Sequence, residues 1–356
     1  MKNPKYLIKF LVWNYICTQR FIFLLFQSIS KFKVSKLYKI PTLILISCIG
    51  YIIAIININL VAFEFLCLKI LFKKENYNSI FIVGLPRSGT TRLHRLIINE
   101  NKIFTSLKTW EIFFAPSVFQ KIFFKYINIL FLSFKIDLKK YIIQLEKLLF
   151  KKFNTIHKLG LFEAEEDGLI LFHLFSCYHL SFILGSEKSY KNYNYNLDIS
   201  PFIWEYYKIC IDNHMFINKG KLYVSKNPFF TKSISTLRTK FKNSKFILIK
   251  RDFKSSLKSF LSLKNFLSVF FYGEKISKKR SYEIIKILEY WYNLNEDYLN
   301  KIDLKFNFSD LTKNPKKIVL TVYNELDIPV TEELNKRLSL ENLNSKKYVS
   351  NHVYIE

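Results

Sequence analysis

The most informative hydrophobic pattern in this chain is a short apolar run that stops at a glycine. Residues 80–83 carry no charged or polar side chain, which is typical of a strand buried on both faces of a parallel sheet. Gly84 ends this run, and residues 90–97 then place apolar side chains at helical spacing. The pattern predicts a strand, a loop from Gly84 to Gly89 and a helix, in that order.

Similar patterns predict further elements along the chain. Two more apolar runs, at residues 221–226 and 245–249, predict strands, and basic residues stand at the end of each. Residues 306–315 predict a strand, a turn and a helix start, with Asp310 as the cap. Helices are expected over residues 118–153 (two helices), 163–177, 201–218, 279–301 and 316–326. The expected helix over 163–177 opens on the densest acidic cluster of the chain.

The first 74 residues differ from the rest, because Glu64 is their only acidic residue. Residues 42–63 carry no charge, and as a helix they would reach about 33 Å, enough to cross a hydrocarbon core of about 30 Å. Residues 6–27 are also apolar, but Lys9 and Arg20 interrupt them, which favours a helix that lies on a membrane surface.

Three arrangements of residues 1–74 remain open: a transmembrane anchor, helices on the membrane surface, or helices packed on the rest of the chain. Asn57, Asn59 and Gly50 weaken the case for a span, and lysines flank the uncharged run on both sides. We expect membrane association through this region, with the side of the membrane that holds the rest of the chain left open, and a cytoplasmic location otherwise.

The net charge of +27 suggests an anionic partner. Lysines are spread along the whole chain without a compact basic run, so most of them are interpreted as a solvated surface, and no nucleic-acid partner is expected. The five cysteines have neither metal-site spacing nor a CxxC motif. We therefore expect no metal site and a reducing compartment.

The loop after the first strand has the chemistry of a phosphate site. Its glycines, Gly84 and Gly89, have the spacing of an ATP or GTP loop, but Thr90 stands where such a loop has its lysine. The cation of this loop is Arg87 instead. Backbone N–H groups at a helix start would bind an anion there, and a single 5'-phosphate group without magnesium fits better than a triphosphate.

The stretch from Gly84 to Thr91, with its PRSGTT motif, resembles the 5'-phosphosulfate loop of the sulfotransferases. The resemblance implies a three-layer α/β domain with a central parallel sheet, related to the P-loop kinases and preceded here by the apolar N-terminal helices. It also implies 3'-phosphoadenosine 5'-phosphosulfate as the co-substrate, with no metal. The residues that would hold its 5' end are Arg87, Ser88, Gly89, Thr90 and Thr91.

A second motif follows the strand at 245–249. Arg251 and Ser259 are eight residues apart, at a strand end and in the following helix, which is similar to the sulfotransferase site for the 3'-phosphate group. Lys226 ends another strand, and such an end faces the ligand crevice of an open α/β sheet. Lys226 and Arg87 are predicted to offset charge on the leaving phosphate oxygen.

Transfer to a hydroxyl group needs a base that takes the proton of the acceptor. Glu166, in the acidic cluster, is the predicted base, and His157 is the alternative. Seven residues separate Glu166 from His173, which would place them on one face of an α-helix. Acidic residues in a first turn also simply complement the helix dipole, and this structural interpretation stays open.

The sequence thus predicts membrane-associating helices over residues 1–74 and a sulfotransferase catalytic domain over 75–356. The predicted reaction transfers a sulfuryl group to a hydroxyl or amine of a small-molecule, lipid or glycan acceptor. Two alternatives are a P-loop kinase or NTPase-like phosphotransferase, which would need ATP and magnesium, and a basic membrane-binding protein without catalysis. The acceptor and the oligomeric state are open.

Overall fold

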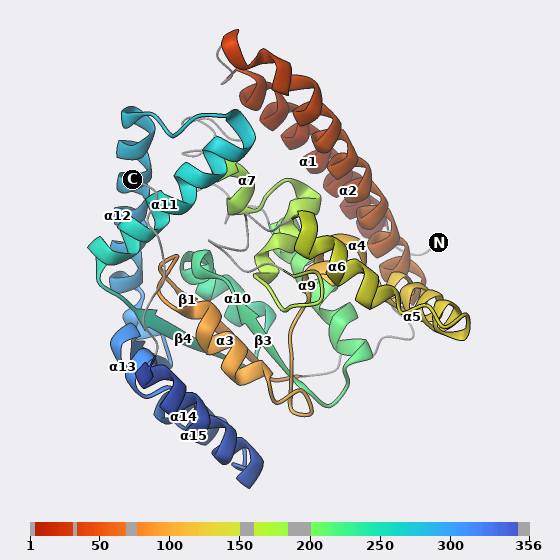
Figure 1. Cartoon of the computed structure of the whole chain (residues 1–356). Coiled ribbons are helices and arrows are strands. Elements are labelled where there is room, and N and C mark those ends of the chain that lie inside the picture. The colour runs from red at the N-terminus through yellow and green to blue at the C-terminus, as the bar shows by residue number, and fades with distance from the viewer. Residues whose placement is uncertain (1–3, 31–33, 69–76, 150–159, 184–200, 348–356) are drawn as a thin grey trace. The chain divides into compact units, whose positions relative to one another are not determined.

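A computed structural model describes residues 4–30, 34–68, 77–149, 160–183 and 201–347 of the chain (Figure 1). By their internal contacts the residues fall into two units. The helical unit comprises residues 1–75, 107–219 and 268–273. The sheet unit comprises residues 76–106, 220–267 and 274–356. Residues 107–219 thus group with the N-terminal helices, while the division of function at residue 74 stays a prediction.

The sheet unit is built on five parallel strands in the order β2-β3-β1-β4-β5. The strands are β1 (Ser79–Gly84), β2 (Phe104–Thr105), β3 (Leu222–Lys226), β4 (Ser244–Lys250) and β5 (Leu304–Asn307). The strands expected over residues 80–83, 221–226 and 245–249 form as β1, β3 and β4, because their apolar runs need burial on both faces. The strand expected from Phe306 is β5, which begins two residues earlier. The two outer strands are short and were not predicted as sheet members.

The strand order brings the predicted phosphate loop next to the second predicted anion site. β1 is central and pairs in register with β3 on one side and β4 on the other, so that Ile82 lies beside Lys226 and Gly84 beside Ile249. The chain leaves β1, β3 and β4 at one edge of the sheet. Ligands of open parallel sheets bind at such an edge, where neighbouring strands lead their chains to different faces.

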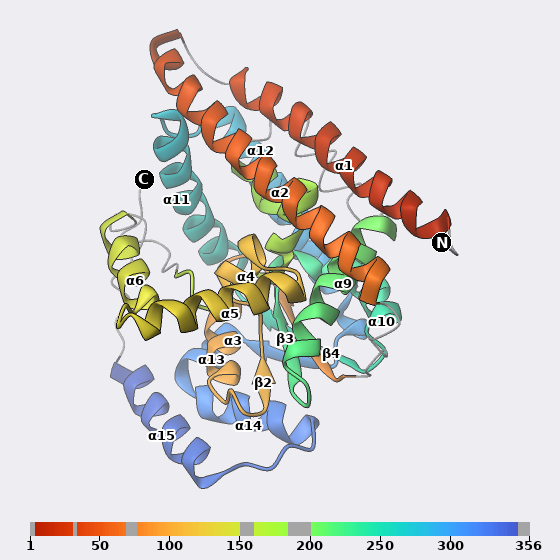
Figure 2. The ribbon, with the colours of Figure 1, turned by 90° about the vertical axis from the view of Figure 1, so that its right-hand side faces the viewer.

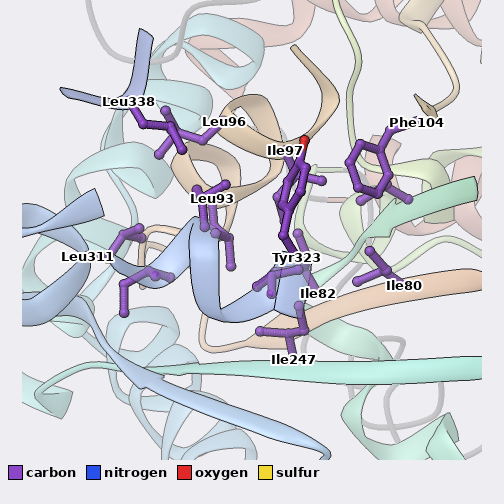
Figure 3. Close-up of a cluster of buried hydrophobic side chains, with 14 of the residues drawn as sticks. Ile80, Ile82, Leu93, Leu96, Ile97, Phe104, Ile247, Leu311, Tyr323 and Leu338 are labelled. Carbon is purple, nitrogen blue, oxygen red and sulfur yellow. The ribbon is translucent and has the colours of Figure 1, made fainter. Parts of the chain in front are cut away.

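Helices cover both faces of the sheet and complete three layers. On one face, Ile80 and Ile82 of β1 belong to the main apolar core together with Leu93 and Leu96 of α3 (Thr90–Ile98) (Figure 3). This core also takes side chains from α13 (Phe308–Lys313), α14 (Pro315–Glu325) and α15 (Glu332–Lys347). On the other face, the ring of Phe81 stacks on Phe246. That face is covered by η5 (Pro228–Ser233) and α10 (Ile234–Lys240), and η5 in turn carries α12 (Lys278–Asp297).

The helical unit begins with the two long apolar helices. Residues 6–27 lie in α1 (Pro4–Ile29) and residues 42–63 in α2 (Ile40–Leu68), which pack on each other and are joined through η1 (Val34–Lys39). By length and composition alone, the stretches Ile8–Ile29 and Lys36–Leu66 are sufficient to span a membrane. The part of this unit that the structure describes further contains α4 (Thr109–Phe114), α5 (Val118–Ser133), α6 (Leu138–Leu149), η3 (Asp167–Leu174), α7 (Tyr178–Ile183) and α9 (Pro201–Ile217). Helix α11 (Phe253–Tyr272) starts in the sheet unit, and its last residues belong to the helical unit.

The prediction of an α-helix over residues 163–177 is wrong, because the structure has a different type of helix there. Asp167–Leu174 forms a 3-10 helix, with Glu166 as its N-cap and Phe175 in the left-handed region at its end. A 3-10 helix has three residues per turn, so positions seven apart do not share a face. His173 consequently turns away from Glu166, and its ring lies 2.9 Å from the Tyr206 hydroxyl and 3.0 Å from the Asn57 amide nitrogen.

The burial of His173 predicts a pH dependence of stability. Burial lowers the pKa of His173 to about 3, well below that of an unfolded histidine, so the unfolded chain binds a proton that the folded chain excludes. We expect the free energy of unfolding to fall as the pH drops from about 6.5 towards 3, with a slope of about 1.4 kcal/mol per pH unit from this group. Urea unfolding at several pH values would measure it, and His173→Gln should flatten this limb. An unchanged slope in that variant would assign the acid sensitivity to other groups.

Candidate active site

The loop between β1 and α3 is shaped to receive an anion. Gly84 and Gly89 both have positive φ angles, 148° and 93°, and Arg87 adopts the left-handed region with a φ of 70°. Gly89 is the N-cap of α3 and has no side-chain oxygen with which to bond the amides of the first turn. The Ser88 hydroxyl is buried, and the described residues provide no hydrogen-bond partner for it. First-turn amides and an unpartnered buried hydroxyl group suit a bound phosphate group.

Gly89 also allows close packing at the base of this loop, which leads to a prediction. A Cβ atom at Gly89 would lie 2.7 Å from the ring of Phe308, whereas a Cβ at Gly220, with a φ of 78°, would meet nothing within 4 Å. We expect Gly220→Ala to cost about 1 kcal/mol for the left-handed backbone alone. Gly89→Ala should cost about 1–3 kcal/mol more, because the aromatic ring must shift. Urea unfolding of the two variants would measure the difference, and equal costs would contradict the close packing.

Two arginines and a serine meet beside the loop. The Nη1 group of Arg251 donates to the backbone carbonyl of Arg87, and the Nε group of Arg87 donates to the Ser259 hydroxyl at 2.9 Å. Arg251 follows β4 directly, and Ser259 lies in α11. The guanidinium of Arg251 also lies over the ring of Phe308, 4.1 Å from its centroid. The structure thus brings the residues of the two predicted anion sites into one cluster.

Lys226 joins the cluster from β3. It is fully buried at the last position of the strand, and its Nζ atom donates to the Thr91 hydroxyl in the first turn of α3 at 3.2 Å. Thr90 is also buried, at the start of the same helix. A lysine ammonium group held at a helix N-terminus adds positive charge where the helix dipole already favours an anion.

A hollow of about 630 Å³ opens at the carboxyl ends of β4 and β5, a size typical of small-molecule sites. Arg251 and Phe308 line it, together with Leu85 of the loop and Tyr292 of α12. Phe308 was missed by sequence analysis. Phe308 directly follows β5, and residues that follow the strands of a parallel sheet often line a ligand site. The sequence predicted this strand but not its position in the sheet, so Phe308 was not identified.

Glu166, the predicted base, belongs to the helical unit. Glu166 is paired with His179, whose Nε2 atom lies 2.8 Å from the carboxylate. Burial alone would lower the pKa of His179, but the Glu166 carboxylate raises it to about 9, so that His179 is protonated at neutral pH. His157 lies outside the described residues. The role of Glu166 as a base stays a prediction.

Among the described residues, no group of three or more His, Cys, Asp and Glu side chains has the arrangement of a metal site. The parallel sheet, the glycine-bounded loop at a helix N-terminus and the basic cluster beside it are features of α/β proteins that bind an anionic group at the strand ends. Residues 79–332 match the model of the sulfotransferase family. The chain belongs to this family and is an enzyme that transfers sulfuryl groups.

Solved structures show the same fold. Sulfotransferase STF1 from Mycobacterium tuberculosis H37Rv superposes with a TM-score of 0.69 at 14% identity, over 95% of this chain and 90% of that chain. Sulfotransferase STF9 from Mycobacterium avium gives a TM-score of 0.61 at 14% identity, over 82% of this chain and 74% of the other. No curated protein matches this chain.

Proposed function

We propose that this sulfotransferase takes its sulfuryl group from 3'-phosphoadenosine 5'-phosphosulfate and transfers it to a hydroxyl or amine of its acceptor. The observation that carries the proposal is the contact of Arg251 with the Arg87 carbonyl and of Arg87 with Ser259. An adenosine with phosphate groups at both its 3' and 5' positions requires two adjacent anion-binding sites. The contacts of this cluster support the proposal that these two sites are adjacent.

In the proposed assignment the loop binds the 5' end of the donor. The residues that hold it are Arg87, Ser88, Gly89, Thr90 and Thr91, through backbone N–H groups, hydroxyl groups and the guanidinium. Arg251 and Ser259 bind the 3'-phosphate group and so select this nucleotide over one that lacks the group. The hollow beside Arg251 and Phe308 offers room for part of the nucleotide.

The proposed transfer is a single in-line displacement at sulfur. The acceptor oxygen forms a bond to sulfur while the bond from sulfur to the 5'-phosphate oxygen breaks, and Glu166 takes the proton of the acceptor. Lys226 and Arg87 offset the negative charge that develops on the leaving phosphate oxygen. Donors fixed before the reaction stabilise such a charge without reorganisation, which is why the buried position of Lys226 suits this role.

Ligand binding tests the donor assignment and makes a prediction for Arg251. Adenosine 3',5'-bisphosphate should raise the melting temperature of the wild-type chain more than ATP with magnesium, or DNA, does. In Arg251→Ala we expect about tenfold or more weaker binding of the bisphosphate, because a charge-assisted contact of about 1.5–3 kcal/mol is lost. The preference of this variant for the bisphosphate over adenosine 5'-monophosphate should also disappear.

Arg280→Ala is the matched control, since Arg280 lies in the first turn of α12 and outside the cluster. It should bind both nucleotides as the wild type does. If Arg251→Ala kept the full preference for the 3'-phosphorylated nucleotide, Arg251 would not be its binding residue. If ATP with magnesium stabilised the wild type most, the kinase-like alternative would replace the proposed donor.

The N-terminal helices bear on the location of the enzyme and, through it, on the class of acceptor. We propose membrane association through residues 1–74, supported by the length and apolar composition of α1 and α2. A membrane-held enzyme meets lipids and membrane glycans more often than soluble alcohols, so the acceptor classes in order of preference are lipid or glycan, then small molecule. Transfer of labelled sulfate to extracts of the native cell would identify the class.

A further inference from the structure

The long N-terminal helices expose apolar side chains along one face each. On α2 the exposed residues follow each other every three or four positions for most of its length, as do those on α1. The α2 face consists of Leu45, Ile49, Ile52, Ile56, Phe63 and Leu66, each 47–61% exposed. The α1 face consists of Ile8, Leu11, Tyr15, Ile22 and Phe26, each 47–70% exposed. Exposure of this many large apolar side chains in rows marks an interaction surface.

The opposite face of α2 packs on the helical unit and carries two buried polar side chains among apolar ones such as Ala54, Ile58 and Val61. Asn57 donates its amide hydrogens to the Phe113 carbonyl at 2.7 Å and to His173. Glu64 is buried and accepts hydrogen bonds from the first amides of α5, at Val118 and Phe119. α2 is therefore apolar on both sides, but the polar side chains of Asn57 and Glu64 point into the protein and the row of exposed side chains on the other side is apolar.

These bonds oppose a transmembrane arrangement of α2. If α2 crossed the bilayer, Glu64 would lie at the depth of the hydrocarbon. The N-terminus of α5, which is bonded to Glu64, would have to lie there too. Charged side chains there are costly. A helix that lies in the plane of the membrane keeps Asn57 and Glu64 on the protein side while its exposed row enters the lipid.

The apolar surface continues from α2 onto α5 and the turn after it. The exposed ring of Phe63 packs against that of Phe119 at the start of α5, with centroids 6.4 Å apart. α5 and the turn after it then expose Phe123, Tyr126, Ile129, Leu130, Leu132 and Phe134, each 49–68% exposed. Figure 2 looks towards this side of the helical unit, with α2 and α5 near the viewer and α1 beside α2. We call the exposed apolar residues of α1, α2 and α5 the apolar face.

The charges around the apolar face favour one kind of partner. Exposed lysines stand on α5, on α6 and in the turn between them: Lys125, Lys135, Lys139, Lys140 and Lys147. The exposed acidic residue of this stretch is Asp137, and Glu64, the acidic residue of α2, is buried. Lysines beside an inserted apolar surface attract anionic lipids. A second copy of the chain would instead place like charges opposite each other.

We propose that the helical unit docks monotopically on an anionic lipid bilayer, with the apolar face inserted into one leaflet and α2 in the plane of the membrane. This inference rests on the proposed membrane association and extends it in two ways: it adds α5 and its following turn to the lipid contact, and it assigns an in-plane arrangement with no crossing. It is independent of the sulfuryl transfer reaction.

Flotation of the full chain with vesicles tests the surface. We expect at least tenfold stronger binding to phosphatidylcholine vesicles with about a third phosphatidylglycerol than to pure phosphatidylcholine, and weaker binding in high salt. Leu130→Glu/Leu132→Glu should weaken binding at least tenfold. The matched control is Leu340→Glu/Leu343→Glu on α15, where the two leucines are 62% and 55% exposed outside the apolar face, and it should bind as the wild type does.

A depth measurement separates the in-plane arrangement from a span. Nitroxide labels at Leu45→Cys, Ile52→Cys and Phe63→Cys, in a chain with Cys48 and Cys67 replaced by serine, should all lie at a similar shallow depth of about 5–10 Å. A label at position 52 near the bilayer centre, with positions 45 and 63 progressively shallower, would overturn the in-plane arrangement and leave membrane association intact. If the chain did not float with vesicles, or formed a dimer that vesicles do not dissociate, both the in-plane arrangement and membrane association would be overturned. The sulfuryl transfer reaction would still be tested separately, by sulfate transfer to a soluble acceptor.

Discussion

Replacement of Lys226 by methionine is expected to lower turnover by about 10²–10³-fold, the loss typical of removing one preorganised donor to a developing negative charge. Lys226 is fully buried at the end of β3, and its ammonium group is held by the Thr91 hydroxyl at the start of α3. The charge is therefore already in place before the donor binds. Steady-state rates of labelled sulfate transfer at saturating nucleotide would measure the loss.

Two controls separate this effect from damage to the fold. Methionine has a similar length and is apolar, so a buried methionine is expected to leave the melting temperature close to that of the wild type. Lys254→Met changes an exposed lysine at the start of α11 and should leave turnover unchanged. Full turnover of Lys226→Met in a folded protein would remove Lys226 from the proposed mechanism.

Replacement of Glu166 by glutamine is expected to lower turnover by about 10²–10⁴-fold, because a general base contributes a factor of that size. Glutamine keeps the shape of the side chain but cannot take the proton of the acceptor. Nucleotide binding should not change, since Glu166 has no proposed role in it. Single-turnover transfer rates and the dissociation constant of adenosine 3',5'-bisphosphate would measure the two effects.

The ion pair with His179 supplies the control for Glu166. His179→Gln removes the cation and leaves the carboxylate, so it should keep most of the activity if Glu166 is the base. The pair stabilises the folded state only while His179 is protonated, with a pKa raised to about 9, so the stability cost of either variant should fade as the pH rises through 9. Equal activity losses in the two variants would indicate that the pair is structural.

Local patterns were sufficient for the elements that carry the anion loop. The apolar run before Gly84, the glycine spacing and the helical spacing after Thr90 all act over a few residues, and β1 and α3 form where they were predicted. The same holds for β3, β4 and the long apolar α2. The family assignment, which rested on the PRSGTT stretch and the downstream arginine and serine, is confirmed by the match over residues 79–332.

Local patterns failed where long-range contacts decide the conformation. Residues 167–174 looked like an α-helix, but they form a 3-10 helix whose His173 bonds Asn57 of α2 and Tyr206 of α9. Asp310 was the expected cap in the segment after β5, whereas Asn307 occupies the N-cap position and Asp310 lies inside α13. The first error has a physical cause, since tertiary partners of His173 outweigh propensities worth a few tenths of a kcal/mol per residue.

The sequence by itself determined the family, the buried strands and the presence of an anion loop, because apolar periodicity, glycine positions and charge act between neighbours in the chain. Only the tertiary structure decided that Arg251 reaches the backbone of Arg87 and that Phe308 closes the base of the loop. It also decided that Asn57 and Glu64 of α2 bond into the protein, leaving an apolar face outward. These contacts join residues 50 to more than 200 positions apart, and the order of strands and the packing of helices set them, which no local pattern records.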